Sequence, residues 1–332
     1  MAVIGTQVAT LADVASRLDK DGKIPKIVEM LAKTNAVLDD APAMQCNNGT
    51  THKTVIRTGI PQATWRLLNR GVDRVKTTTA AVEEATGMLE AYAEVDKRLV
   101  DIAENGESFR VSEAVGVAEG MSQQVATALW YGGRETPERF LGFAPRFATL
   151  DPAKAESARQ VIDAGGTGST NTSAWLITWG ENTAHLLYPK GSKAGLSHEN
   201  KGQVTLFDEN NKPYEGYRDH WQWDIGLAVR DYRYISRVAN IDVSQMTADA
   251  TYLKGIIRHF ILASEQIQST GMGKTVWYVN RQLRGLFRLA ILEKVATNLT
   301  WETVAGKRFM MFDEYPVHMS EALLSTEARV TV

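Results

Sequence analysis

A glycine-rich stretch late in the chain contains residues of the kind that bind phosphate. It reads STGMGKTVWYVNR over residues 269–281 and includes Gly-Lys-Thr, part of the G-x-x-x-x-G-K-[ST] phosphate-binding loop. In that loop, backbone N–H groups and the N-terminus of the following helix point at the phosphates. Here Gln268 stands where the first glycine should be, and the apolar run VWYV after Lys274 predicts a strand instead of a helix. We therefore interpret residues 271–274 as a helix-to-strand turn and not as a nucleotide site.

The other residues capable of chemistry are isolated from one another. The cluster GGTGST at residues 165–170 lacks the G-x-G-x-x-G spacing of a dinucleotide site and is typical of a surface loop. The single Cys46 has no paired catalytic signature. No two histidines stand at the spacing that brings metal ligands together on one helix face, so we predict no catalytic, cofactor-binding or metal-binding residue. The six histidines are His52, His185, His198, His220, His259 and His318.

The composition is that of a folded globular protein. The chain has 332 residues, of which 44% are hydrophobic, and its formal net charge is −2 at pH 7. So small a charge does not steer the whole molecule onto nucleic acid or an anionic membrane. No apolar run approaches the roughly 20 residues of a membrane span, and the first residues, MAVIGTQ, do not follow the signal-peptide pattern. One cysteine excludes an intramolecular disulfide and indicates a reducing compartment.

The elements that would position these residues include both helices and strands. Apolar residues recur at intervals of three and four in residues 87–103, and an Ala-rich stretch at 112–130 ends before two glycines, so both predict helices. Residues 174–188 predict a hairpin with a turn at Glu181-Asn182, and residues 217–241 alternate like one long strand. The last third predicts helices at 251–267 and 281–295, the second capped by Asn280, and strands at 275–279, 309–312 and 315–319.

Residues 46–86 are basic and rich in β-branched side chains, with glycine and proline interruptions that predict two strands joined by a long excursion. From residue 53 to residue 76 the cations stand against one acid, Asp73. Two interpretations remain open: a solvated basic hairpin, or an arm that reaches across an acidic neighbour. Trp65 is accordingly either an anchor buried against a partner or part of the core at the base of the loop. The candidate contact residues are Arg57, Trp65, Arg66, Arg70, Arg74 and Lys76.

Six blocks, in order along most of the chain, carry a more specific pattern than any of these motifs. They are PQATWRLLNRGVDRVKTTT (61–79), GMLEAYAEVD (87–96), TSAWLITWGENTAHLLYPKGSKAGLSHENKG (172–202), LAVRDYRYISRVANID (227–242), VWYVNR (276–281) and VAGKRF (304–309). In these blocks the chain resembles the major capsid proteins of tailed bacteriophages. The pattern is closest to that of short-tailed, Bordetella-type phages.

This resemblance implies an α+β fold, the Hong Kong 97-like (HK-97-like) capsid fold. Such a fold has an N-terminal arm, an extended loop, a peripheral domain with a long spine helix, and an axial domain. The implied division is an arm at 1–45, an extended loop at 46–86, a peripheral domain at 87–241 and an axial domain at 242–332. Within the peripheral domain, residues 112–130 would form the spine helix, and residues 174–188 and 217–241 would form strands.

The resemblance also implies a function without catalysis or a cofactor. The chain would be a major capsid (head) protein that self-assembles as hexamers and pentamers into an icosahedral shell around phage double-stranded DNA. Its implied partners are itself, scaffolding proteins, decoration or cement proteins, a portal, and packaged DNA bound without sequence specificity. It would belong to the virion and be assembled in the cytoplasm of the host bacterium, with no membrane involved. No residues identify an inter-subunit Lys–Asn crosslink, so we predict none. An encapsulin-like shell and a soluble enzyme without a recognisable motif remain as alternatives.

Overall fold

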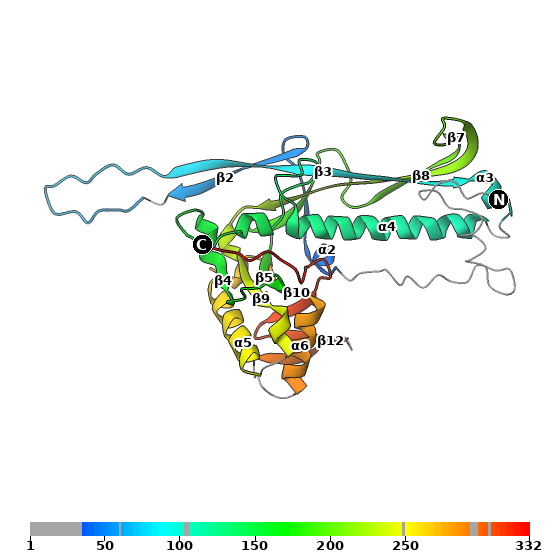
Figure 1. Ribbon diagram of the computed structural model, residues 1–332. Coiled ribbons are helices and arrows are strands. Elements are labelled where there is room, and N and C mark those ends of the chain that lie inside the picture. The colour runs from blue at the N-terminus through cyan, green and yellow to red at the C-terminus, as the bar shows by residue number, and fades with distance from the viewer. Residues whose placement is uncertain (1–34, 60, 103–105, 248–249, 293–297, 305–306) are drawn as a thin grey trace.

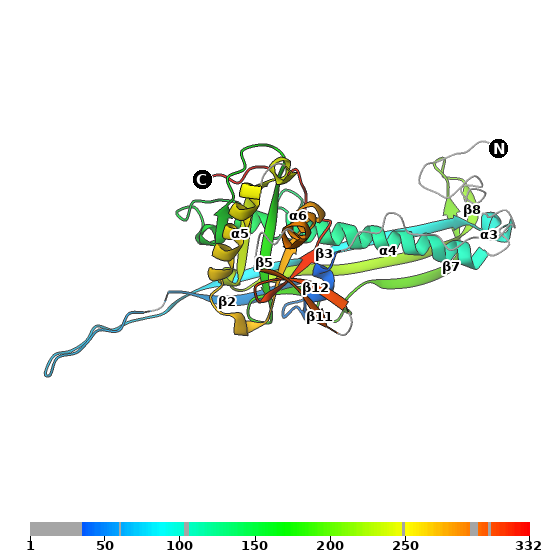
Figure 2. The same cartoon turned by 90° about the horizontal axis from the view of Figure 1, so that it is seen from below.

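A long helix lies beneath an extended sheet, a loop projects from one end of the sheet, and a second group of helices and strands lies below (Figure 1, Figure 2). This computed structural model describes residues 35–59, 61–102, 106–247, 250–292, 298–304 and 307–332. Of the predicted N-terminal arm, residues 1–34 lie outside the described residues. The two residues before the first helix, Asn35 and Ala36, begin the described part.

The described strands form one sheet of thirteen strands, in the order β11-β12-β13-β10-β5-β6-β8-β3-β2, with β1, β4, β7 and β9 attached beside this path. The first seven strands are β1 (Ala43–Gln45), β2 (Thr51–Gly59), β3 (Thr78–Asp96), β4 (Val161–Asp163), β5 (Asn171–Trp179), β6 (Ala184–Tyr188) and β7 (Ser197–Phe207). The remaining six are β8 (Pro213–Val229), β9 (Ile235–Asp242), β10 (Lys274–Val279), β11 (Leu299–Val304), β12 (Lys307–Phe312) and β13 (Tyr315–Met319).

The described α-helices cover the two faces of this sheet. They are α2 (Val37–Asp40), α3 (Lys97–Ile102), α4 (Gly106–Tyr131), α5 (Ala250–Glu265) and α6 (Arg281–Leu292). Short 3₁₀ turns at Ala144–Phe147, Glu156–Gln160, Tyr232–Tyr234, Val243–Thr247 and Thr270–Met272 connect the longer elements. No helix in these described ranges has both the length and the apolar character needed to cross a membrane.

The central strand β5 separates two hydrophobic cores because its successive side chains point to opposite faces. All of its residues are buried. On one face Trp175 belongs to the core that includes Leu129 and Trp130 of α4. On the other face Leu176 belongs to the core that includes Phe260 of α5 and Phe287 of α6. A strand buried on both faces has apolar residues at successive positions, as β5 has from Ala174 to Ile177.

The predicted helix at 112–130 is confirmed and extends over Gly106–Tyr131. It ends where the chain must fold back closely on itself. A Cβ atom on Gly132 would lie 2.3 Å from the backbone oxygen of Phe140, so only glycine fits there. The predicted elements of the last third are also present as α5, β10, α6, β12 and β13. The last three residues expected for the helix at 281–295 lie outside the described residues.

The predicted helix at 87–103 is wrong. Residues up to Asp96 belong to β3, and of the rest Lys97–Ile102 form the short helix α3. The strand pairs with β2 through Ala85 and with β8 from Thr86 onward. Apolar residues at intervals of three and four predicted the helix. In the structure, strands that are distant in sequence pair with β3, and every second side chain from Met88 to Tyr92 is exposed.

The predicted hairpin at 174–188 is also wrong. Strands β5 and β6 share a single register pair, between Trp179 and Ala184, and it is parallel. Instead β5 lies between β9 and β10, and β6 lies beside β8. A buried strand such as β5 needs a neighbouring strand on each edge because its backbone N–H and C=O groups must form hydrogen bonds. The single long strand predicted at 217–241 is divided into β8 and β9 by the 3₁₀ turn at Tyr232–Tyr234.

Candidate inter-subunit surfaces

The segment between β2 and β3 projects away from the rest of the molecule (left in Figure 1). The two strands pair from Thr51↔Ala85 to Gly59↔Thr78, and the described residues 61–77 beyond them contain no strand. Every residue from Gln62 to Ala81 is exposed. We call residues 46–86 the extended loop.

The candidate contact residues share this projecting segment. Trp65 is 100% exposed, so the interpretation that it packs in the core of its own chain is wrong. Beside it Leu67 and Leu68 are also exposed, at 70% and 92%. The cations Arg66, Arg70, Arg74 and Lys76 are exposed, and none of them makes an ion pair with any described residue. Arg57 lies in β2.

The base of the extended loop is fixed by buried polar residues. The guanidinium of Arg146 donates two hydrogen bonds to the carboxylate of Glu84, at 2.6 and 2.8 Å, and Glu84 is only 7% exposed. Next to this pair His52 of β2 packs edge-on against His185 of β6, with ring centroids 5.8 Å apart. Burial lowers the pKa of His185 to about 4, so its ring is neutral at pH 7. The loop therefore starts from a buried, hydrogen-bonded base, whereas its tip is exposed.

A second polar cluster holds the start of the described chain against the sheet. The carboxylate of Asp40, in α2, accepts hydrogen bonds from Lys274 Nζ at 2.6 Å and from the Tyr278 hydroxyl at 2.7 Å. His318 Nδ1 lies 2.6 Å from the same carboxylate. Burial raises the pKa of Asp40, but the hydrogen bonds outweigh it and lower the pKa to about 2. The lysine of the Gly-Lys-Thr stretch thus pairs with a carboxylate of its own chain, as a turn residue at the start of β10.

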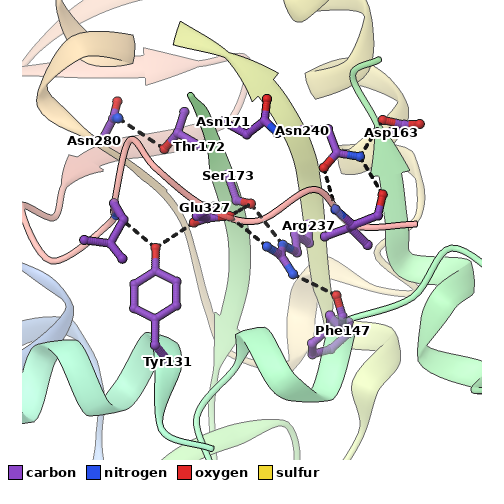
Figure 3. A network of polar contacts seen from close by, with 12 residues as sticks. Tyr131, Phe147, Asp163, Asn171, Thr172, Ser173, Arg237, Asn240, Asn280 and Glu327 are labelled. Carbon is purple, nitrogen blue, oxygen red and sulfur yellow. Dashed lines mark hydrogen bonds and ion pairs between the residues drawn. The ribbon is translucent and has the colours of Figure 1, made fainter. Parts of the chain in front are cut away.

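A third network joins four distant parts of the chain around Glu327 (Figure 3). Its carboxylate accepts hydrogen bonds from the Tyr131 hydroxyl of α4 at 2.6 Å and from Ser173 of β5. Arg237 of β9 completes the set with an ion pair of 2.8 Å, in which both side chains are at most 5% exposed. Arg237 also donates to the Phe147 carbonyl at 2.8 Å, so the buried charge is both paired and hydrogen-bonded.

This network fastens residues 320–332, which we call the C-terminal strap, across the body of the molecule. Asn240, in the left-handed region with φ 57°, donates to the Val330 carbonyl and accepts from the Val330 N–H, at 2.9 and 2.8 Å. Leu150 donates its N–H to the Thr331 carbonyl at 3.1 Å. The strap therefore reaches α4, β5 and β9, and its first residues also contact the start of α6, where Glu321 pairs with Arg281.

The contacts of Asp40, Arg237 and Glu327 were not predicted from the sequence. Arg237 and Glu327 are 90 residues apart, and each stands in an unremarkable local context, so no spacing pointed to the pair. Within the described ranges, no three His, Cys, Asp or Glu side chains gather as a metal site would require. A cavity of about 290 Å³ between α4 and β3 is lined largely by Met88, Leu89, Val125, Ala128 and Phe140, a lining without a catalytic constellation.

Comparison with known proteins identifies this architecture. The family model for the major capsid protein GP7 matches residues 19–331. The structure of bacteriophage Epsilon15 contains a chain that is 37% identical, with 100% of both chains covered and a TM-score of 0.77. Weaker likenesses include the capsid of a native GTA particle, at 11% identity and a TM-score of 0.49 over 70% of this chain and 98% of that one. The holo-SrpI encapsulin complex from Synechococcus elongatus PCC 7942 matches at 14% identity and a TM-score of 0.42, over 71% and 98%. No curated protein matches the sequence.

The projecting loop, the long helix under a sheet and the separate lower part are together the α+β, HK97-like fold of shell-forming capsid proteins. The chain belongs to the major capsid protein GP7 family. It is a structural protein and not an enzyme, and it assembles with itself into the capsid shell of a virion. The more specific likeness to Bordetella-type phages stays a prediction.

Proposed function

We propose that this major capsid protein forms hexamers and pentamers of an icosahedral shell, and that its extended loop makes the contact that orders neighbouring subunits. The observation that supports this proposal is that Trp65 is 100% exposed, on a basic segment whose residues from Gln62 to Ala81 are all exposed. A buried tryptophan removes roughly 150–250 Å² from water, so an exposed one flanked by two exposed leucines is costly in solution. A neighbouring subunit would cover this surface.

The charges of the extended loop would affect how neighbouring subunits align more than how tightly they bind. Arg66, Arg70, Arg74 and Lys76 outnumber Asp73, so the loop is attracted to an acidic face. Such pairs raise the rate of encounter and penalise wrong alignments. The apolar residues would supply the central buried contact, and the cations would form its polar rim.

The buried contacts at the base of the extended loop support its proposed role in the contact between subunits. The bidentate Glu84–Arg146 pair and the buried His52–His185 contact hold the strands where the loop leaves the body. A preorganised segment loses less conformational entropy on docking than a flexible one. The partner change of β3, from β2 to β8 between Ala85 and Thr86, supports a loop boundary at residue 86. With it we propose the division into an arm (1–45), extended loop (46–86), peripheral domain (87–241) and axial domain (242–332).

The remaining partners follow from membership of the capsid family. We propose that the shell encloses double-stranded DNA, contacted through its backbone without sequence readout, and that the net charge of −2 keeps this contact weak. Scaffolding proteins, cement proteins and a portal would complete the particle, and assembly would take place in the cytoplasm of the host bacterium.

The test is to replace Trp65 by alanine and to examine the purified protein by sedimentation and negative-stain microscopy. We expect the wild-type chain to form closed shells and Trp65→Ala to need at least about tenfold more protein for assembly, since truncating an interface anchor costs about 2 kcal/mol or more. The thermal unfolding of unassembled subunits should not change. Thr64→Ala alters the preceding exposed residue and serves as the matched control. Equal assembly of Trp65→Ala and the wild type would contradict the role of the loop.

A further inference from the structure

Helix α6 presents a largely exposed basic face. Leu283, Phe287 and Ala290 are buried against the sheet, and Arg281, Arg284 and Arg288 recur at intervals of three and four on the opposite side. Leu289 and Leu292 flank these cations and are 55% and 77% exposed. We call these five residues, Arg281, Arg284, Arg288, Leu289 and Leu292, the basic face.

Two of these three arginines have no carboxylate partner in the part of the chain that the structure describes. Arg281 pairs with Glu321. Arg284 approaches only the sulfur of Met319, at 3.9 Å, and Arg288 lies 6.0 Å from the ring centroid of Trp301. Burial together with the charges of Arg288 and Arg281 lowers the pKa of Arg284. The basic face is therefore crowded with like charge in the isolated chain, a cost that an acidic partner would remove.

The same part of the molecule carries acids that are equally unpaired. Glu265 ends α5, and Asp313 and Glu314 form the turn between β12 and β13. All three are exposed, and none makes an ion pair with a described residue. Asp313 accepts a hydrogen bond from the amide of Asn298. All three carboxylates surround Tyr315, whose pKa is raised by burial and by their charges. We call Glu265, Asp313 and Glu314 the acidic end.

We propose that the basic face of one subunit docks against the acidic end of the next, through α6 on one side and the β12–β13 turn on the other. The partner is a second copy of this chain, because the complementary charge lies in this chain and finds no partner within it. Two different surfaces that fit each other make a head-to-tail contact, which closes into a ring when the rotation between copies allows it. The exposed leucines would lie between the charges and be buried there.

This inference extends the proposed function and rests on it, since both describe contacts within one shell. The two contacts use separate surfaces: the extended loop lies at one end of the sheet, and α6 lies in the lower part (Figure 1). A shell built from several modest contacts assembles reversibly before it closes, so each contact contributes a measurable share.

Charge reversal tests the pairing. One variant carries Arg284→Glu and Arg288→Glu, a second carries Glu265→Lys and Glu314→Lys, and a third carries all four changes. We expect each two-site variant to need at least about tenfold more protein for assembly than the wild type at low salt, because like charges then meet across the contact. The four-site variant should recover most of this loss, since every contact again joins opposite charges.

The outcomes separate this proposal from its alternatives. Normal assembly of either two-site variant, or a four-site variant that assembles no better than the two-site ones, would overturn it. If the first variant assembles normally but loses retention of short duplex DNA, nucleic acid is the occupant and the proposal fails. Failure of the wild type to form shells would refute the proposed function itself. Thermal unfolding of the unassembled chains controls for folding. Where a double change does not fold, the single changes Arg288→Glu and Glu314→Lys replace the two-site variants, and their combination replaces the four-site variant.

Discussion

At the scale of single residues, Lys274 of the Gly-Lys-Thr stretch stabilises the fold through its contact with Asp40. The Asp40 carboxylate is contacted by Lys274 and Tyr278 of β10 and by His318 of β13, and these two strands pair with each other in the sheet. A carboxylate with several donors keeps its charge at low pH and stabilises the folded state as long as it is ionised. Asp40 therefore fastens the short helix α2 to the centre of the molecule.

Acidification should remove the stabilisation by Asp40 within a defined pH range. The pKa of Asp40 is about 2 in the folded chain against 3.8 for the ordinary side chain, so its stabilisation is complete above about pH 4 and is lost as the pH falls toward 2. The difference corresponds to a contribution on the order of 2 kcal/mol. We expect Asp40→Asn to lower the stability of the unassembled chain at pH 7 and to flatten its acid dependence between pH 4 and 2. Urea unfolding at several pH values measures both.

Asp39→Asn provides the control, because Asp39 is exposed and adjacent in sequence. It should follow the wild-type acid dependence. An Asp40→Asn chain that loses as much stability on acidification as the wild type would show that the carboxylate does not have this role.

At the scale of elements, local signals predicted the helices better than the strands. The spine helix α4 and the strand–Asn280–helix unit of β10 and α6 were visible because helix caps and repeats act within a few residues; the Asn280 side chain accepts the N–H of Leu283 at 2.8 Å, as predicted. The part of β3 from Gly87 onward was mistaken for a helix because its pairing partner β8 lies far away in sequence. Pairing of this kind is decided by tertiary context, which a short window does not contain.

The contact surfaces and buried networks differ in how far a sequence can predict them. The basic extended loop was recognisable because its cations lie within one short stretch of sequence. The buried networks around Glu327 and Asp40 were not, since each is assembled from side chains that only the completed fold brings together. The acidic end likewise combines the end of α5 with a turn almost fifty residues later.

The turn before β10 allows a direct test of close packing between elements. A Cβ atom on Gly273 would lie 2.0 Å from the backbone oxygen of Trp179, which cannot retreat without moving β5. We expect Gly273→Ala to destabilise the chain by at least about 2 kcal/mol, as overpacking against backbone does. Thermal unfolding of unassembled subunits measures the effect.

Gly271→Ala is the matched control, because its nearest neighbour would be the Ser269 hydroxyl at 4.0 Å. It should change stability by less than about 0.5 kcal/mol. Similar losses for both variants would mean that backbone freedom matters in this turn more than the space beside Gly273.

At the scale of the whole molecule, the C-terminal strap unites parts that are distant in sequence. Glu327 contacts α4, β5 and β9 at once, and Val330 is held by Asn240 on both backbone atoms. Removing one partner of a buried ion pair leaves an uncompensated charge, which is more damaging than the loss of the pair itself. The last residues therefore stabilise the body of the subunit as a whole.

We expect Glu327→Gln to reduce the free energy of unfolding by about 3–5 kcal/mol, because Arg237 would then be buried without a counter-charge. Glu199→Gln removes an exposed partner of Lys201 and should leave the free energy of unfolding almost unchanged. Urea unfolding of the unassembled chains compares the two. Equal losses would show that burial of the Arg237–Glu327 pair confers no special sensitivity on the strap.

The continuity of β3 has a mechanical consequence. One unbroken strand runs from the extended loop, along β8, to the far end of the sheet at Asp96. A pull on the loop tip along the strand direction is transmitted into this ladder, whose hydrogen bonds lie across the strands. The bonds between Thr86↔Gly226 and Asp96↔Gly216 are then loaded in shear and share the force, instead of opening one after another like a zipper. Internal pressure that strains one subunit contact would in this way be distributed over the sheet of the subunit behind it.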